Sequence, residues 1–266
     1  MRLGRFTSIT EVYNWIEQFF NEYNTDITQV LQTLQTYETN LEEITLILKQ
    51  SVSLEEAFVP DRHTEVTCLD GSVIRTGSSG SWAALRDGAG NQASASGLTF
   101  AVTIASYTVL NTWMNLLRII LLFDTHTLPS NAYITQAVLR VYCAGKTDIA
   151  TWATSLCVTG ATPASDIDLV NADYGRVSDI VLSNRISTPA IYASQFVEFT
   201  LNPDGIAAID KDGITRFALR EATYDVANVA PPWISNQSFT IAFNAADSTT
   251  YLDRRPLLFV SYILPP

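Results

Sequence analysis

Aspartates carry the clearest capacity for chemistry in this sequence. From residue 51 onward there are 15 Asp but only 5 Glu. Asp166, Asp168 and Asp173, and the pair Asp210 and Asp212, bring enough oxygen ligands together in sequence to bind a hard cation such as calcium. Paired carboxylates can also hydrolyse glycosidic bonds. Because none of these spacings follows a calcium-loop pattern and Asp is a common turn former, we expect these carboxylates to cap loops.

The residues that act as nucleophiles or metal ligands elsewhere are sparse here. The three cysteines, Cys68, Cys143 and Cys157, are expected to be buried and free, and His63 and His126 lie in no ligand spacing. The run Gly77–Ser81 ends in serine, so it lacks the final glycine of the G-x-S-x-G nucleophile elbow. We therefore predict no catalytic residue, no metal and no cofactor, and expect that the protein is not an enzyme.

Aromatic residues offer a different chemistry, because an indole face can stack on the C–H face of a sugar. Most of the tryptophans are expected to pack in the core. Trp233 follows Pro231 and Pro232, which places it on an extended loop. It is the candidate for contact with a ligand.

The overall composition excludes several classes of protein. Of the 266 residues, 47% are apolar and only 16% are charged, and the net charge is -11 with just three lysines. Disordered chains have low hydrophobicity and high charge, and nucleic-acid-binding proteins need clustered basic residues, so neither class fits. No apolar run is long enough to insert into a membrane, and the N-terminus lacks the pattern of a secretory signal.

The N-terminal part contains a regular heptad repeat. Residues 8–50 have no glycine or proline, and Ser8 with Glu11 forms a capping-box pattern at the start. Apolar residues recur at alternating spacings of four and three, which is typical of a coiled coil. The predicted oligomerisation residues are Ile9, Tyr13, Ile16, Phe20, Tyr23, Ile27, Val30, Leu34, Tyr37, Leu41, Ile44 and Leu48.

A single rod with this repeat needs partner helices, and the chain offers no second long heptad segment. We expect another copy of the same chain as the partner. Leu at one core position, Ile at the other and extra apolar flanking residues favour a parallel homotrimer over a dimer or tetramer. The alternative is a helical hairpin, or a helix docked on the rest of the chain.

The remainder of the sequence is typical of a mainly β protein. Short alternating or β-branched runs are separated by Gly, Asn, Asp, Ser and Pro, which favours an antiparallel β-sandwich or jelly roll. Leu116–Phe123 is expected to be a central strand although Arg118 interrupts it, and residues 203–209 a short helix. The predicted organisation is a helical coiled coil over residues 1–50, a linker over 51–64 and a β-sandwich head over 65–266.

Several stretches of the second part resemble a known family. Leu117–Pro129 contains an Arg-x-x-x-x-Phe-Asp strand and a Leu-Pro turn, and Arg255–Leu258 has an Arg-Pro-x-Leu pattern. Together with Trp82–Gly90, Phe217–Arg220 and the pair Tyr224 and Asp225, these stretches resemble the DNRLRE-type β-sandwich modules over residues 65–265. The resemblance implies a β-sandwich of the kind found in surface, carbohydrate-binding and phage structural proteins, and it assigns no binding residue here.

These expectations lead to a functional hypothesis. A coiled-coil stalk before a β-sandwich suits a bacteriophage virion appendage, such as a tail fibre, capsid fibre or capsid decoration protein, made in the host cytoplasm. The N-terminal segment with Leu3, Phe6 and Ile9 would anchor to other virion proteins, and the sandwich would face outward toward host surface glycans. The alternative is a carbohydrate-binding module or surface adhesin outside any virion.

Overall fold

The computed structural model describes residues 8–23, 27–50, 53–150 and 152–265. The described chain divides into two compact units. One contains the helices up to Ser53 together with the C-terminal residues from Ile263, and the other spans Leu54–Tyr262. No described helix is both long enough and apolar enough to cross a lipid bilayer.

The N-terminal unit contains two helices, α1 (Ile9–Tyr23) and α2 (Ile27–Gln50). Ser8 caps α1 as expected, since its hydroxyl accepts a hydrogen bond from the Glu11 N–H at 3.3 Å. In α2 the hydroxyls of Thr33, Thr36 and Thr39 each donate to the carbonyl four residues earlier, at 2.8–3.0 Å. These bonds satisfy the threonines within the helix itself.

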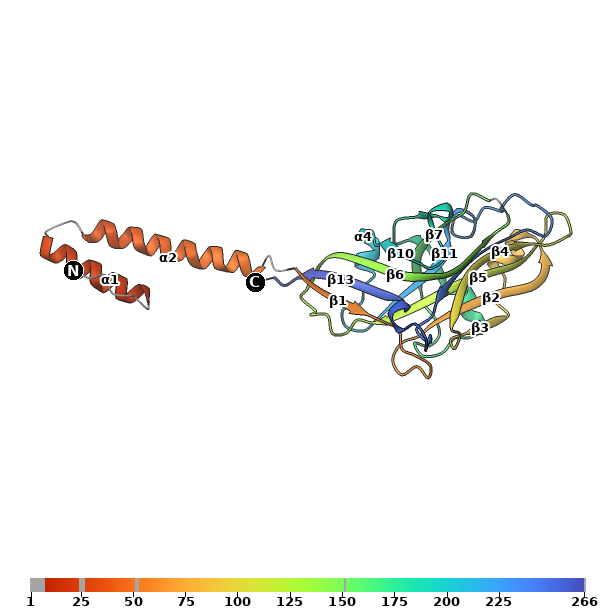
Figure 1. Ribbon diagram of the computed structural model, residues 1–266, viewed down its shortest axis with the longest axis horizontal. Coiled ribbons are helices and arrows are strands. Elements are labelled where there is room, and N and C mark those ends of the chain that lie inside the picture. The colour runs from red at the N-terminus through yellow and green to blue at the C-terminus, as the bar shows by residue number, and fades with distance from the viewer. Residues whose placement is uncertain (1–7, 24–26, 51–52, 151, 266) are drawn as a thin grey trace. The chain divides into compact units, whose positions relative to one another are not determined.

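The expectation of one continuous helical rod is wrong. Ile9, Val12 and Tyr13 of α1 line the same groove as Leu34, Tyr37 and Leu41 of α2. In a continuous helix with a rise of about 1.5 Å per residue, Tyr13 and Leu34 would lie roughly 30 Å apart. The chain therefore folds back as a helical hairpin, and α1 and α2 lie side by side (Figure 1). Asn24, Thr25 and Asp26, which separate the helices in sequence, are residue types that favour caps and turns over helix interiors.

The second unit is mainly β, as predicted, and its described strands pair in antiparallel fashion. Its strands are β1 (Leu54–Phe58), β2 (Asp70–Gly80), β3 (Gln92–Ser94), β4 (Thr99–Ser106), β5 (Trp113–Asp124), β6 (Tyr133–Asp148), β7 (Ser155–Ala161), β8 (Val177–Val181), β9 (Ile186–Ser187), β10 (Gln195–Thr200), β11 (Ile214–Glu221), β12 (Ser238–Asn244) and β13 (Leu257–Ile263). Short helices connect them: α3 (Trp82–Asp87), α4 (Pro203–Ala207), 3-10 turns at Asn171–Gly175, Thr188–Ala190 and Leu252–Arg254, and a π-helical turn at Ala222–Val226.

The strands form one continuous network around a single core. The order of neighbours is β1-β13-β6-β12-β4-β5-β11-β7-β8. In addition, β10 pairs with β6, β2 with β5, β3 with β2, and β9 with β7. The long strand β5 pairs along one edge with β2, and along the other first with β4 and then with β11. Such strands that change partner let an antiparallel sheet fold over on itself and cover both of its faces.

Burial of β5 confirms the prediction of a central strand. Ile119, Ile120, Leu121, Leu122 and Phe123 are all at most 2% exposed, so side chains on both faces of the strand pack into protein. The helix predicted at residues 203–209 is α4, where the Asn202 side chain caps the Gly205 N–H at 2.9 Å. Residues 61–68 form a loop in which the Asp61 carboxylate accepts hydrogen bonds from the Val66 and Cys68 N–H groups.

The β domain begins earlier than the sequence suggested. Within the segment expected to be a linker, Leu54–Phe58 forms β1, which pairs along its whole length with β13. Phe58 lies opposite Leu258 and joins the core, whereas Leu54 at the other end of the strand is exposed. The first and last strands of the domain thus close the sandwich together.

Substitution of Phe58 tests whether β1 is part of the folded β domain. Phe58→Ala should lower the free energy of unfolding by about 3 kcal/mol, because a large buried side chain leaves a cavity. Leu54→Ala in the same strand should change it by less than about 1 kcal/mol, because Leu54 is already exposed. Urea titrations followed by tryptophan fluorescence measure both. Equal effects of the two variants would contradict the assignment of β1 to the core.

Candidate functional site

The helical hairpin presents an apolar face to its surroundings. A groove of about 200 Å³ between α1 and α2 is lined by Ile9, Val12, Tyr13, Leu34, Tyr37, Glu38 and Leu41. Leu41 and Ile44 are 56% and 52% exposed, and Ile9 and Tyr37 are also exposed. Contact between two helices leaves this face only half covered, so the hairpin offers a continuous apolar surface to a partner.

The predicted oligomerisation residues separate into three groups. Ile9, Tyr13, Leu34, Tyr37 and Leu41 meet at the groove, and Ile44 continues the same face of α2. Ile16 and Val30 are partly buried. The side chains of Phe20, Tyr23, Ile27 and Leu48 lie outside those that the structure describes, as do Leu3 and Phe6 of the expected anchor.

The β domain contains a buried cluster of charged residues around Asp225. Arg118 on β5 and Arg220 on β11 each bind the Asp225 carboxylate with two hydrogen bonds, at 2.6–3.0 Å. The three residues are 3%, 1% and 0% exposed. Burial alone would raise the pKa of Asp225, but the positive charges of Arg118 and Arg220 outweigh it and hold that pKa well below its usual range.

A third arginine connects the buried cluster to a carboxylate at the protein surface. Arg86 on α3 donates to the Asp225 carbonyl at 2.6 Å and to the Asp179 carboxylate at 2.7 Å. Arg220 also donates to Asp179, at 2.9 Å. Burial by itself would raise the pKa of Asp179, yet the hydrogen bonds from the two guanidinium groups lower it. Asp179, with its side chain half exposed, therefore closes the cluster at the protein surface.

Local structure holds each member of the cluster in place. The buried Glu221 carboxylate accepts hydrogen bonds from the N–H groups of Thr223, Tyr224 and Asp225 at 2.6–3.1 Å, so it caps the π-helical turn that carries Asp225. Arg118 lies over the Tyr174 ring at 4.2 Å and donates to the Tyr174 carbonyl at 2.7 Å. Burial raises the pKa of the Tyr174 hydroxyl, which donates to Leu85 at 2.8 Å and stays protonated.

Above the cluster lies an open depression of about 190 Å³. It is lined by Arg86, Asp87, Arg118, Gly175, Val177, Asp179 and Arg220. The guanidinium groups here already donate to carboxylates and carbonyls of the protein itself. This arrangement joins β5, β11, β8, α3 and the 3-10 turn Asn171–Gly175, and we interpret it as the element that fixes the sandwich.

The sequence pattern alone does not assign this cluster, although Arg86, Arg118, Arg220 and Asp225 lie in the stretches that resemble the DNRLRE-type modules. A signal was present at Arg118, which interrupts an otherwise apolar strand. An arginine in a central strand must be buried, and a buried charge needs a carboxylate partner. Which of the 15 aspartates provides it depends on the fold.

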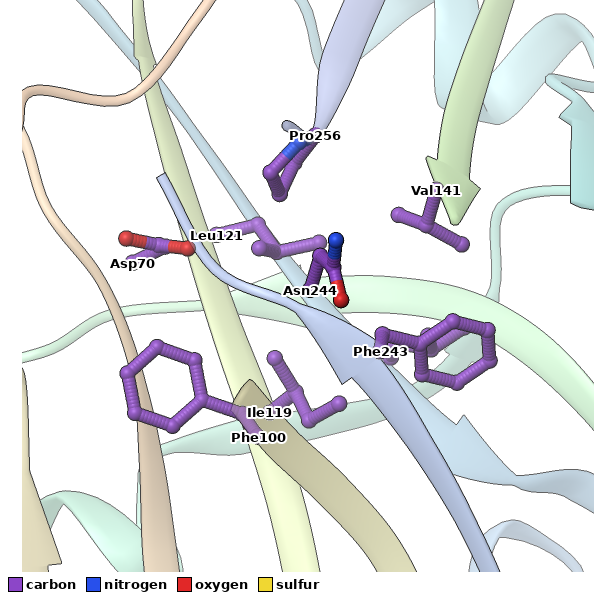
Figure 2. Close-up of a pocket in the computed structure, with 9 residues that line it drawn as sticks. Asp70, Phe100, Ile119, Leu121, Val141, Phe243, Asn244 and Pro256 are labelled. Atoms are coloured by element: carbon purple, nitrogen blue, oxygen red, sulfur yellow. The ribbon is translucent and has the colours of Figure 1, made fainter. Parts of the chain in front are cut away.

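A second buried carboxylate lies beside a small cavity between the layers of the sandwich. The cavity, of about 10 Å³, is lined by Asp70, Phe100, Ile119, Leu121, Val141, Leu219, Phe243, Asn244 and Pro256, and Figure 2 shows Asp70 and Asn244 among these apolar side chains. That volume is about one water molecule. One oxygen of Asp70 accepts from the Ala246 N–H at 2.8 Å, and the other has no hydrogen-bond partner among the described residues.

Asp70 is uncharged at neutral pH. Burial is the main cause that raises its pKa to about 8; the nearby acidic groups of Asp247 and Glu65 act in the same direction, and the hydrogen bond from Ala246 acts against them. A protonated carboxyl avoids the cost of a buried, unpaired charge.

The aspartates considered for a cation site act within loops. Asp166 pairs with Arg216 through two hydrogen bonds of 2.7 Å, Asp173 accepts from the Ala164 and Val170 N–H groups, and Asp210 accepts from the Asp212 N–H. Asp168 accepts from the Leu169 N–H. Within the described ranges, no three or more His, Cys, Asp or Glu side chains are arranged to hold a metal ion.

The remaining candidates have simple environments. Trp233 is half buried and packs against the core. Less of its indole is therefore exposed than the predicted position on an extended loop implied. Its contact with a ligand stays a prediction. Cys68, Cys143 and Cys157 are buried and free, as expected, and burial raises the pKa of the Cys68 and Cys157 thiols to about 11 and about 12. They are therefore unreactive at neutral pH.

Comparison with known proteins finds distant likeness among solved structures only. No protein-family model matches the sequence, and no curated protein matches it. Among solved structures, a protein titled "xylan-binding module CBM15" is similar to 80% of this chain and 99% of its own, with 10% sequence identity and a TM-score of 0.31. A likeness at this level supports no argument about the ligand of the present chain.

Removal of the central carboxylate tests the importance of the buried cluster. Asp225→Asn should lower the free energy of unfolding by about 3–5 kcal/mol, because the buried Arg118 loses its counter-charge and Arg220 keeps only the half-exposed Asp179. Asp166→Asn is the control, since it breaks a similar two-bond pair with Arg216 at the surface and should cost about 1 kcal/mol or less. Urea unfolding monitored by near-ultraviolet circular dichroism compares them. Similar losses would show that the cluster contributes no more than a surface ion pair.

The raised pKa of Asp70 predicts a pH dependence of stability. The pKa of Asp70 is about 8 in the folded chain and near 3.8 otherwise. Its contribution to the free energy of unfolding is therefore complete below about pH 4, declines as the pH rises and levels off above about pH 8. In Asp70→Asn that decline should be absent, since an amide keeps the acceptor for Ala246 and cannot ionise. Thermal melts from pH 4 to pH 9 measure this, with exposed Asp212→Asn as the control. Parallel profiles for wild type and Asp70→Asn would contradict the assignment.

Proposed function

We propose that the protein is a bacteriophage virion structural protein, an appendage in which the helical unit joins copies of the chain and the β-sandwich faces outward. The observation that carries the proposal is the exposed apolar face of the hairpin, formed by Ile9, Tyr37, Leu41 and Ile44. These residues keep the heptad spacing, and a row of this kind is stable in water only when another surface covers it.

The partner that fits this face best is a second copy of the same face. The row is apolar with polar flanks, as in self-associating helix bundles. Partly buried Phe19 and Leu31 widen it, which supports three copies rather than two. Three heads held together would gain avidity for a repeating surface even if each contact is weak.

The β domain supports a display role. Its fold is closed around one main core, and the Arg118–Asp225–Arg220 cluster ties the neighbouring strands β5 and β11 to the π-helical turn. The proposal also draws on the resemblance to DNRLRE-type modules. The site of action is then the virion, with other virion proteins and host surface glycans as further partners.

The exposed helix face gives the direct test of self-association. The full-length protein should have the mass of three chains by light scattering. The double variant Leu41→Asp, Ile44→Asp should be monomeric, because buried carboxylates would be uncompensated at the interface. A control with Gln35→Glu and Asn40→Asp adds negative charge at exposed polar positions of the same helix and should remain oligomeric. A monomeric wild-type protein, or a variant that stays oligomeric, would refute this interface.

Assignment to a virion needs a separate measurement. Quantitative mass spectrometry of purified particles from a culture that produces the chain should find it at a copy number divisible by three. Recovery only in the particle-free fraction would refute the virion assignment and favour a free carbohydrate-binding module or surface adhesin.

A further inference from the structure

Four neighbouring strands of the sandwich end together at one end of the β domain. The strands β6, β12, β4 and β5 are consecutive neighbours. Their end registers pair Phe239 with Asp148, Ser238 with Ala105, and Ser106 with Trp113. The loops 107–112 and 227–237 therefore emerge side by side with Ile149, at the end of the domain opposite the start of β1 and the end of β13 (Figure 1).

These loops expose an apolar surface, which we call the tip. Its exposed side chains are Tyr107, Val109, Leu110, Ile149, Val229 and Ile234; Leu110 is 67% exposed. Neither loop contains a charged residue or a histidine, although the chain as a whole carries a net charge of -11. Between the apolar residues lie Thr108, Asn111, Ser235, Asn236 and Gln237, which carry only hydroxyl and amide groups.

The tip is held in a defined conformation. Within its first loop the Tyr107 N–H donates to Thr112 at 2.9 Å, and the Ser106 hydroxyl connects to the second loop through the Gln237 N–H at 2.9 Å. The indole N–H of Trp152 donates to the Pro232 carbonyl at 2.9 Å. Asn111, Asn228 and Asn236 adopt positive φ angles of 54–56°, a region that asparagine tolerates better than most residues. A surface ordered before binding loses little conformational entropy when it binds.

We propose that the tip binds a neutral polysaccharide. Tyrosine and aliphatic side chains match the C–H faces of sugar rings, and the interspersed hydroxyl and amide groups can exchange hydrogen bonds with sugar hydroxyls. The two loops contain no basic residue, so they provide no Coulomb attraction for anionic glycans or for anionic lipid headgroups. The inference rests on the proposed function, in which the β domain faces the host, and it names the surface and the class of glycan.

Affinity electrophoresis of the full-length protein tests the proposal. Native gels containing dextran, xylan, galactomannan or amylopectin are compared with a gel containing polygalacturonate. At least one neutral polysaccharide should retard the protein, and the retardation should persist in high salt. The double variant Tyr107→Ala, Leu110→Ser should bind at least about tenfold more weakly, because it removes central apolar contacts. The control Ile180→Ser removes an equally exposed apolar side chain on β8 and should bind like wild type.

Several results would overturn the assignment. They are the absence of retardation in every neutral gel, equal retardation of the tip variant, or retardation by polygalacturonate alone. Flotation with phosphatidylcholine vesicles that the tip variant loses would identify a lipid surface instead. Light scattering on the same samples separates this proposal from the preceding one. A monomeric protein that a neutral polysaccharide still retards would refute only the proposed assembly. An oligomer that no neutral polysaccharide retards would refute only the proposed binding at the tip.

Discussion

The fold of the β domain depends on one buried interaction, the Asp225 carboxylate held between the guanidinium groups of Arg118 and Arg220. Taking three charges out of water is costly, so the interaction is favourable only where geometry satisfies every donor and acceptor. Here β5, β11 and the π-helical turn supply that geometry, with the Glu221 carboxylate fixing the turn. Arg86 also binds the half-exposed Asp179, so the network of paired charges extends to the protein surface. The cluster thus selects one register and one arrangement of strands, which apolar packing alone would specify less sharply.

The two units of the chain treat their apolar residues in opposite ways. The sandwich buries most of its large apolar side chains, mainly in one core, because its strands change partners and cover both faces of the sheet. The hairpin contains only two helices, and two helices cannot enclose an apolar face on their own. Tyr37, Leu41 and Ile44 therefore remain exposed. This contrast is the physical basis for proposing that assembly occurs through the helices and display through the sandwich.

Local pattern was informative wherever a short stretch decides its own structure. The cap at Ser8, the helix at Pro203–Ala207 and the buried strand containing Leu116–Phe123 follow from neighbouring residues, and the structure confirms them. The heptad row was read correctly as helical but wrongly as one rod. A spacing of three and four residues identifies a helix face, yet it holds equally when the second half of the row folds back on the first, as α2 does on α1. Similarly, β1 was missed because Leu54–Phe58 is a strand only through its pairing with β13.

By itself, the sequence determined a mainly β chain with helices at its N-terminus, buried free cysteines and an apolar row that needs cover. These properties follow from composition and from periodicities of two and of three to four residues, which are local. Only the tertiary structure decided which aspartate neutralises Arg118, that Asp70 sits beside an apolar cavity and stays protonated, and that the uncharged loops 107–112 and 227–237 meet at one end. Each of these depends on contacts between residues more than 100 positions apart in the sequence. Such contacts are set by the path of the chain in space.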